Sequence, residues 1–317
     1  MPELTTPLPS TAQVPRGVYR FAVGTAACAV LLLMAGALVT SNDAADSVPD
    51  WPLAYGKIIP PMVGGIRYEY AHRVMAGTVA ILTAILAIWL ARRGSPFLRK
   101  LGWTALGLLI AQSFLGGMRV LFQDPALTAT LHAILAQIFF ITIVNLALFT
   151  SDWWMRDLPH LDDPGSPPLR TLALITTAAV FVQLILGAGF RHGAFGILPH
   201  IIGAFVVLFL VMSTGRTVRK RFGATPDLRR WGILLQSFLG TQFLLGIAAY
   251  WAVVQEIKAG QPTTTYVVLT VAHVLVGALT LAASVVLTLR SFRLIRSSGR
   301  IAASSPVAGS NAESSRA

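Results

Sequence analysis

Apolar residues along this chain form eight long runs separated by short polar segments. Each run is long enough to cross a bilayer core as a helix, which takes about 20 mostly apolar residues. The sequence therefore predicts an all-α integral membrane protein with eight transmembrane helices. We place the runs near residues 19–39, 70–91, 101–121, 128–149, 170–190, 198–215, 231–252 and 266–289.

The composition agrees with this prediction. Of the 317 residues, 55% are hydrophobic and 12% are charged, whereas soluble domains carry roughly 25% charged residues. The single cysteine, Cys28, lies inside an apolar run. One cysteine excludes an intramolecular disulfide, and also an iron–sulfur cluster or thiolate zinc site built from this chain alone.

The formal net charge of +12 follows from membrane topology and requires no nucleic-acid partner. Of the 25 Lys and Arg residues, 19 fall on one side of the eight predicted helices. Such an excess is typical of cytoplasmic segments. We therefore expect a multi-pass protein of the cell (inner) membrane, in contact with lipid, with both termini cytoplasmic. The six basic residues on the other side are Lys57, Arg67, Arg73, Arg119, Arg191 and Lys258.

A repeated pentapeptide indicates that the chain has two related halves. The sequence Gln-Ser-Phe-Leu-Gly occurs at 112–116 and again at 236–240, each time before a run with a histidine near its start. This favours two pseudo-symmetric four-helix bundles related by an axis along the membrane normal. The predicted parts are a disordered cytoplasmic N-terminus (1–18), an N-terminal bundle (19–150), a cytoplasmic linker (151–169), a C-terminal bundle (170–290) and a cytoplasmic tail (291–317).

Four histidines lie near the start of the even-numbered runs, which all enter the membrane from the outer face. They are His72, His132, His200 and His273, and at 1.5 Å per helical residue they lie within about 10 Å of one another in depth. We predict the pairs His72 with His132 and His200 with His273. Paired imidazoles on facing helices are typical ligands of haem iron. Ordinary interhelical hydrogen bonding is the alternative for each histidine.

Charged residues at the same level differ between the halves. Glu69 lies one turn before His72, whereas Ile197 occupies that offset before His200. A carboxylate there can transfer a proton or stabilise positive charge. The N-terminal half is therefore the expected reaction site, and the other half an electron relay or structural haem site. Arg73 and Arg191 are candidates for contacts with haem propionates, or are plain interfacial anchors.

These features together resemble the haem A synthase family of cytochrome oxidase assembly. The resemblance rests on Glu69, His72 and Arg73, on the preceding segment Pro-Asp-Trp-Pro-Leu-Ala-Tyr-Gly at 49–56, and on one histidine at the head of each even-numbered helix. It covers residues 17–295. It implies oxidation of the C8 methyl of haem O to a formyl group by successive hydroxylations, giving haem A.

The resemblance also implies roles for the site residues. His200 and His273 would hold a haem b cofactor, and His72 and His132 would take the haem O substrate, with Glu69 as the catalytic residue beside its reacting edge. Expected partners are a haem O synthase that supplies the substrate, the cytochrome oxidase that receives haem A, and an electron donor such as a quinol.

One departure from the family pattern affects electron delivery. Many members carry two cysteines in the first outer loop, where this chain has Val48 and Ala54. A relay through a loop disulfide is therefore excluded. Electrons would arrive through the C-terminal haem or directly from a quinol-type donor.

Two other functions fit parts of the pattern. In a bis-histidine haem b electron-transfer protein, both pairs would hold permanent haem and Glu69 would have no role in the chemistry. A transporter would account for the repeat, but the sequence has no helix pair broken by Gly and Pro at the membrane midplane.

Overall fold

The computed structural model describes residues 15–122 and 125–296. Its eight long helices all have the length and hydropathy to cross a membrane, so the prediction of an all-α, eight-span membrane protein is confirmed. Residues 1–14 of the predicted N-terminal lead and 297–317 of the predicted tail lie outside the described residues. The helices are α1 (Arg16–Ser41), α2 (Ile66–Arg93), α3 (Pro96–Phe122), α4 (Pro125–Phe149), the short α5 (Asp152–Met155), α6 (Leu169–Arg191), α7 (Ile197–Phe222), α8 (Pro226–Ala259) and α9 (Thr264–Leu294).

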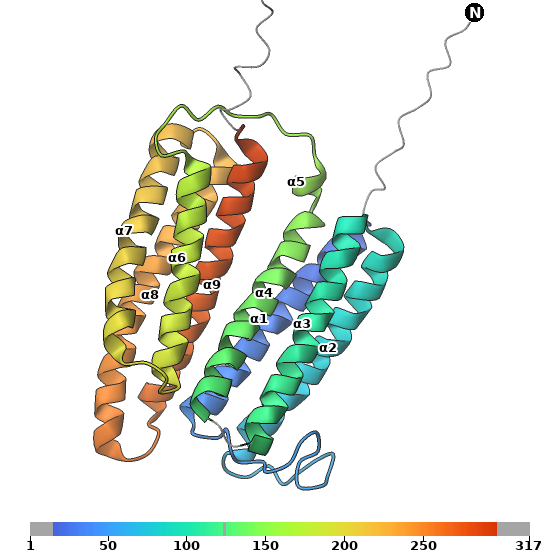
Figure 1. The fold of residues 1–317 in the computed structure, drawn as a ribbon, viewed down its shortest axis with the longest axis vertical. Coiled ribbons are helices and arrows are strands. Elements are labelled where there is room, and N and C mark those ends of the chain that lie inside the picture. Colours follow the sequence, from blue (N-terminus) through green and yellow to red (C-terminus); the bar gives the residue numbers. More distant parts are fainter. Residues whose placement is uncertain (1–14, 123–124, 297–317) are drawn as a thin grey trace, which may run out of the picture.

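The long helices form two groups of four (Figure 1). In the first group α1 and α3 each pack against α2 and α4, and in the second α6 and α8 each pack against α7 and α9. The groups meet where α9 contacts α1 and α4, and where α4 contacts α6. If α1 is exchanged with α6, and α4 with α9, the α1–α9 contact becomes the α6–α4 contact and the α4–α9 contact is unchanged. The interface therefore has the pattern that a two-fold relation between the bundles would produce.

Helix α9 lies at the centre of the molecule. Half of its most apolar stretch is buried, the largest share among the described spans, and its residue Ala278 joins the core of the first bundle around Leu86 and Phe140. The outward faces are also apolar, as with Phe209, which is 71% exposed. Helices that are apolar all round belong in lipid.

Helix α8 is longer than a bilayer requires. Its 34 residues span about 51 Å at 1.5 Å per residue, against about 40–45 Å for a bilayer with its headgroups. The tip of the α8–α9 hairpin consequently projects at the end of the molecule opposite the linker (Figure 1).

The linker between the bundles is anchored at several points. Leu161 pairs with the backbone at the end of α9, donating its N–H to Leu294 O at 2.8 Å. Asp163 is buried, forms an ion pair with Arg221 of α7 at 3.1 Å, and accepts from Leu169 N at 2.6 Å where α6 begins. The linker therefore fixes the inner ends of α6, α7 and α9 relative to one another.

Replacing the buried linker carboxylate should loosen this end of the protein. We expect Asp163→Ala to lower the unfolding free energy by about 3 kcal/mol, because Arg221 loses its buried partner. Thermal unfolding in detergent and limited proteolysis of the linker measure this. Asp162→Ala, at the exposed neighbouring position, is the control and should behave as wild type; equal stability of both variants would contradict the anchoring role.

Candidate functional site

The four histidines share one packing arrangement. In each, the ring carbon Cε1 lies against a glycine of the preceding helix, and a Cβ atom added at that glycine would lie only 2.8 to 3.2 Å from Cε1. Contacts that short leave almost no room for a side chain, so glycine lets each imidazole approach the backbone. The pairs are His72 with Gly36 (α1), His132 with Gly116 (α3), His200 with Gly187 (α6) and His273 with Gly246 (α8).

These contacts show that the two copies of the repeated pentapeptide do not occupy equivalent positions. Gly116 packs on His132, but an added Cβ at its pentapeptide counterpart, Gly240, would have no described atom within 4 Å. The structural counterpart of Gly116 is Gly246, six residues or about 9 Å further along α8. The two identical pentapeptides therefore lie at different positions in their bundles. The residues equivalent to Gln112 and Gly116 are Gln242 and Gly246.

The two histidines of the C-terminal bundle face one another. Their ring centroids lie 6.3 Å apart and their planes are inclined by 83°. Two imidazoles that bind one metal from opposite sides, with metal–nitrogen bonds of about 2.0–2.1 Å, have centroids roughly 6 Å apart. His200 and His273 are thus spaced as a pair of axial ligands.

The polar atoms of the site fit a bound metal porphyrin. Nδ1 of His72, His132 and His273 is buried, with no hydrogen-bond partner within the described part of the chain. Leaving such an atom unpaired is costly. Across residues 15–122 and 125–296, no three His, Cys, Asp or Glu side chains gather to hold a bare metal ion. Pairs of imidazoles beside glycines suit a haem, whose porphyrin supplies the other ligands.

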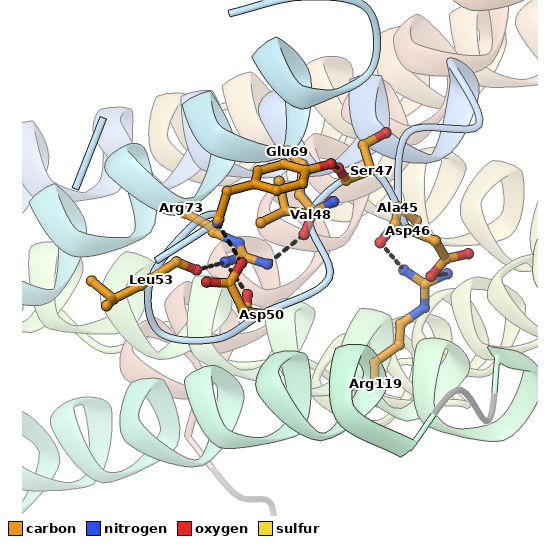
Figure 2. Close-up of polar contacts among 10 residues, drawn as sticks. Ala45, Asp46, Ser47, Val48, Asp50, Leu53, Glu69, Arg73 and Arg119 are labelled. Carbon is orange, nitrogen blue, oxygen red and sulfur yellow. Dashed lines mark hydrogen bonds and ion pairs between the residues drawn. The ribbon is translucent and has the colours of Figure 1, made fainter. Parts of the chain in front are cut away.

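Glu69 lies one turn into α2, where it joins that helix to the outer loop, residues 42–65 (Figure 2). The side chain is buried; Oε1 accepts from Arg73 Nη2 at 2.6 Å and Oε2 from the backbone N–H of Val48 at 3.0 Å. Arg73 also donates through Nη1 to the carbonyl oxygens of Asp50 (2.7 Å) and Leu53 (2.8 Å). The Glu69–Arg73 ion pair therefore holds the loop against α2.

The loop is also held to α3. The Trp51 ring packs against Phe114, with centroids 6.0 Å apart, and against Gly117, where an added Cβ would lie 2.7 Å from the ring. Arg119 donates to Ala45 O at 3.3 Å. The loop consequently lies across the outer end of the first bundle (Figure 1).

Inside the loop, Asp50 organises a tight turn. Its carboxylate accepts from the backbone N–H groups of Gly56 (2.8 Å) and Tyr55 (2.6 Å), and the bond from Gly56 is the main cause that lowers the pKa of Asp50. Val48 and Ala54, the positions at which the family resemblance led us to look for cysteines, are 0% and 2% exposed. Apolar packing and hydrogen bonds fix the loop in this chain.

A second polar cluster joins the two bundles. Arg191 at the end of α6 donates to Ala37 O (3.2 Å) and Ser41 Oγ (2.6 Å) of α1, and Ser41 Oγ lies 2.8 Å from Thr270 Oγ1 of α9. Burial, reinforced by the charges of Arg191 and Arg119, lowers the pKa of His192 to about 4, so His192 is neutral at neutral pH. Sequence reasoning missed this cluster, because Ser41 and Thr270 are 229 residues apart.

Comparison with known proteins agrees with this geometry. The structure gives an all-α membrane protein with two histidines near helix starts in each of two helical bundles, and residues 66–199 match the COX15-CtaA family model, described as "Cytochrome oxidase assembly protein". The chain is thus similar to this family over that segment, which agrees with the resemblance that the sequence motifs indicated. The matched segment contains Glu69, His72, Arg73 and His132, and ends just before His200.

Individual relatives are similar over much of their length. The chain is 29% identical to the heme A synthase of Symbiobacterium thermophilum over 262 residues, which are 71% of this chain and 85% of that protein. It is 29% identical to the heme A synthase of Halalkalibacterium halodurans, covering 60% of this chain and 55% of the relative. For the heme A synthase of Shouchella clausii the identity is 33%, with coverage of 41% and 45%.

The close approach of imidazole and glycine can be tested by replacing one of the glycines with alanine, which adds a single methyl group. Gly187→Ala would place Cβ 2.8 Å from Cε1 of His200, so the ring must shift. We expect the affinity of the His200 and His273 site for haem to fall at least tenfold, the order found when ligand orientation is lost, while the His72 and His132 site is unaffected. Gly240→Ala, which meets open space in α8, is the matched control. Equal haem affinity of that site in the two variants would contradict the packing argument.

A separate test concerns the contacts by which Arg73 of α2 fastens the outer loop. Arg73→Met should leave the buried Glu69 carboxylate without its cationic partner and release two loop carbonyls, so the loop amides open more often. We expect the Val48 amide to exchange hydrogen at least tenfold faster. Arg67→Met is the control, since Arg67 is exposed and contacts only the adjacent Tyr68 among described residues. Unchanged exchange at Val48 would show that Arg73 does not hold the loop.

Proposed function

We propose that this protein is a haem A synthase that oxidises the C8 methyl of haem O to a formyl group by successive hydroxylations and loss of water. The observation that carries the proposal is the set of four imidazoles seated on glycines, two in each bundle. Similarity to known proteins supports it, because the relatives above carry the name heme A synthase.

One bundle would hold the haem cofactor and the other would bind the haem substrate. His200 and His273, in the bundle spanning 170–290, would hold haem b, which supplies a one-electron redox centre when bound. His72 and His132, in the bundle spanning 19–150, would bind the haem O substrate. The 6.3 Å separation of the His200 and His273 rings supports the first assignment.

Glu69 is proposed as the catalytic residue of the N-terminal site. It is buried and ion-paired, and a paired carboxylate is better suited to accept a proton or stabilise positive charge than to donate a proton. Ile197 lies three residues before His200, as Glu69 lies three residues before His72. The proposed carboxylate chemistry is therefore restricted to the N-terminal bundle. The outer loop above that bundle would keep bulk water from the reacting methyl group.

The membrane setting follows from the same proposal. Both termini would lie in the cytoplasm and the two haem sites near the outer leaflet of the cell membrane. Arg191 and Arg73 are proposed to contact propionates through the guanidinium N–H groups left free by the contacts above. A quinol-type donor would supply electrons, a haem O synthase the substrate, and cytochrome oxidase would receive the product.

The decisive experiment identifies the haems bound to purified wild type and to Glu69→Gln. The amide keeps an oxygen for Val48 N and the shape of the side chain, but cannot take a proton. We expect wild type to contain haem b together with haem O or haem A. Glu69→Gln should retain haem b and haem O and form haem A at least a hundredfold more slowly, as for loss of a general base.

Glu256→Gln, on the outer part of α8, is the matched control and should form haem A normally. A permanent haem b in both sites, with redox cycling unaffected by Glu69→Gln, would instead establish an electron-transfer protein. Absence of haem from the wild-type protein would contradict the proposal altogether.

A further inference from the structure

Three of the four histidines have a second contact with the preceding helix, in each case a glutamine. Gln112 Nε2 donates to the backbone oxygen of His132 at 2.9 Å. Gln183 Nε2 donates to His200 O at 2.8 Å and lies 3.0 Å from His200 Nδ1. Gln242 Nε2 lies 3.3 Å from Nε2 of His273.

The glutamines occupy one register position. Each lies four residues before the glycine on which its histidine packs, as in Gln183 and Gly187. The residue four positions before Gly36 in α1 is Leu32. The His72 ring also lies beside the backbone of Leu32, as the His200 ring lies beside that of Gln183. Leu32 is therefore the counterpart of the glutamines, but its side chain has no hydrogen-bonding group.

A glutamine at this position suits a metal-bound imidazole. A histidine that binds metal through one ring nitrogen carries a proton on the other, and usually donates it to an oxygen atom that fixes the ring. Oε1 of Gln112, Gln183 and Gln242 is buried and, among the described residues, has no partner. In the structure the NH₂ groups face the histidines. An amide can turn to present its oxygen instead, so these buried oxygens are the candidate acceptors for a ring N–H when the other ring nitrogen binds metal.

The amides of the C-terminal bundle are themselves held in place. Gly203 of α7 lies against the Gln183 amide, and Gly277 of α9 lies against the Gln242 amide, where an added Cβ would come 3.1 Å from Nε2. Gly203 and Gly277 lie three and four residues after their histidines. The residues at those offsets after His72 are Met75 and Ala76, neither of them a glycine. The His72 position therefore lacks both the glutamine and the close packing that would fix it.

We infer that Gln112, Gln183 and Gln242 are positioning residues that make three of the imidazoles permanent ligands, and that Leu32 leaves His72 as the exchangeable one. This rests on the proposed function in which the imidazoles bind haem iron. The C-terminal site then has two fixed ligands, as a resident cofactor requires. The N-terminal site has one fixed ligand and one that releases, as a site that exchanges substrate for product requires.

The test measures how fast ferric haem b leaves each site of the full-length protein in detergent. Transfer to an excess of apomyoglobin is followed by absorbance. The C-terminal site is measured alone in a His132→Ala background and the N-terminal site alone in a His273→Ala background. The low-spin electron paramagnetic resonance signal reports whether the remaining imidazoles still ligate the iron.

We expect Gln183→Leu to speed haem loss from the C-terminal site by about 10- to 100-fold, the range found when a second-shell partner of a metal ligand is removed. Leu32→Gln should slow loss from the N-terminal site by about tenfold or more. Gln236→Leu is the matched control. It lies on α8 like Gln242, but its amide contacts Met212 and Arg219 instead of a histidine.

The outcomes separate this inference from the proposed function. If the single-site proteins bind no haem, the proposed function fails, and the inference fails with it. The inference alone is overturned if the single-site proteins bind haem and neither substitution changes the rate of haem loss. In that case Gln183→Leu loses haem as fast as Gln236→Leu, and Leu32→Gln as fast as its unsubstituted background. If Gln183→Leu does not fold, Leu32→Gln decides: slower loss supports the inference and an unchanged rate refutes it.

Discussion

The arrangement of this protein depends on the close contact between an imidazole and the backbone of the preceding helix. A glycine at the contact lets the two helices approach until the ring lies against the main chain, as small residues do in membrane helix pairs. Four such contacts fix the spacing of α1 with α2, α3 with α4, α6 with α7 and α8 with α9. The histidines thus act as packing elements as well as candidate ligands, which restricts the positions that the other helices can take.

On this common frame the two halves differ at their outer ends. The first bundle is covered by a loop that Glu69, Arg73 and Trp51 hold in place, whereas the helices of the second continue into the long α8–α9 hairpin (Figure 1). A loop fastened by a few contacts opens at a smaller free-energy cost than continuous helix. The difference matches a division between a site that exchanges its occupant and one that keeps it.

Much of this could be predicted from the sequence because membrane helices are long and apolar. Hydropathy located the eight spans, and the position of each histidine near a helix start revealed the candidate ligands. The identical pentapeptides indicated two related halves but do not lie at equivalent positions, since identity over five residues carries no information about depth or face. The spacing of glutamine and glycine in Gln183–Gly187 and Gln242–Gly246 was the better signal. The partners of Arg73 and Arg191 depend on chain segments that only folding brings together.

The cluster of Arg191, Ser41 and Thr270 has a consequence for electron flow. It ties the outer ends of α1, α6 and α9 together, while the linker ties the inner ends of α6, α7 and α9. Of these contacts, those of Arg191 and Thr270 with α1 join the second bundle to the first. Electron tunnelling between two redox groups falls off exponentially with their separation. An interface fixed by these contacts would keep that separation, and hence the tunnelling rate, constant even if the loop above the first bundle opened.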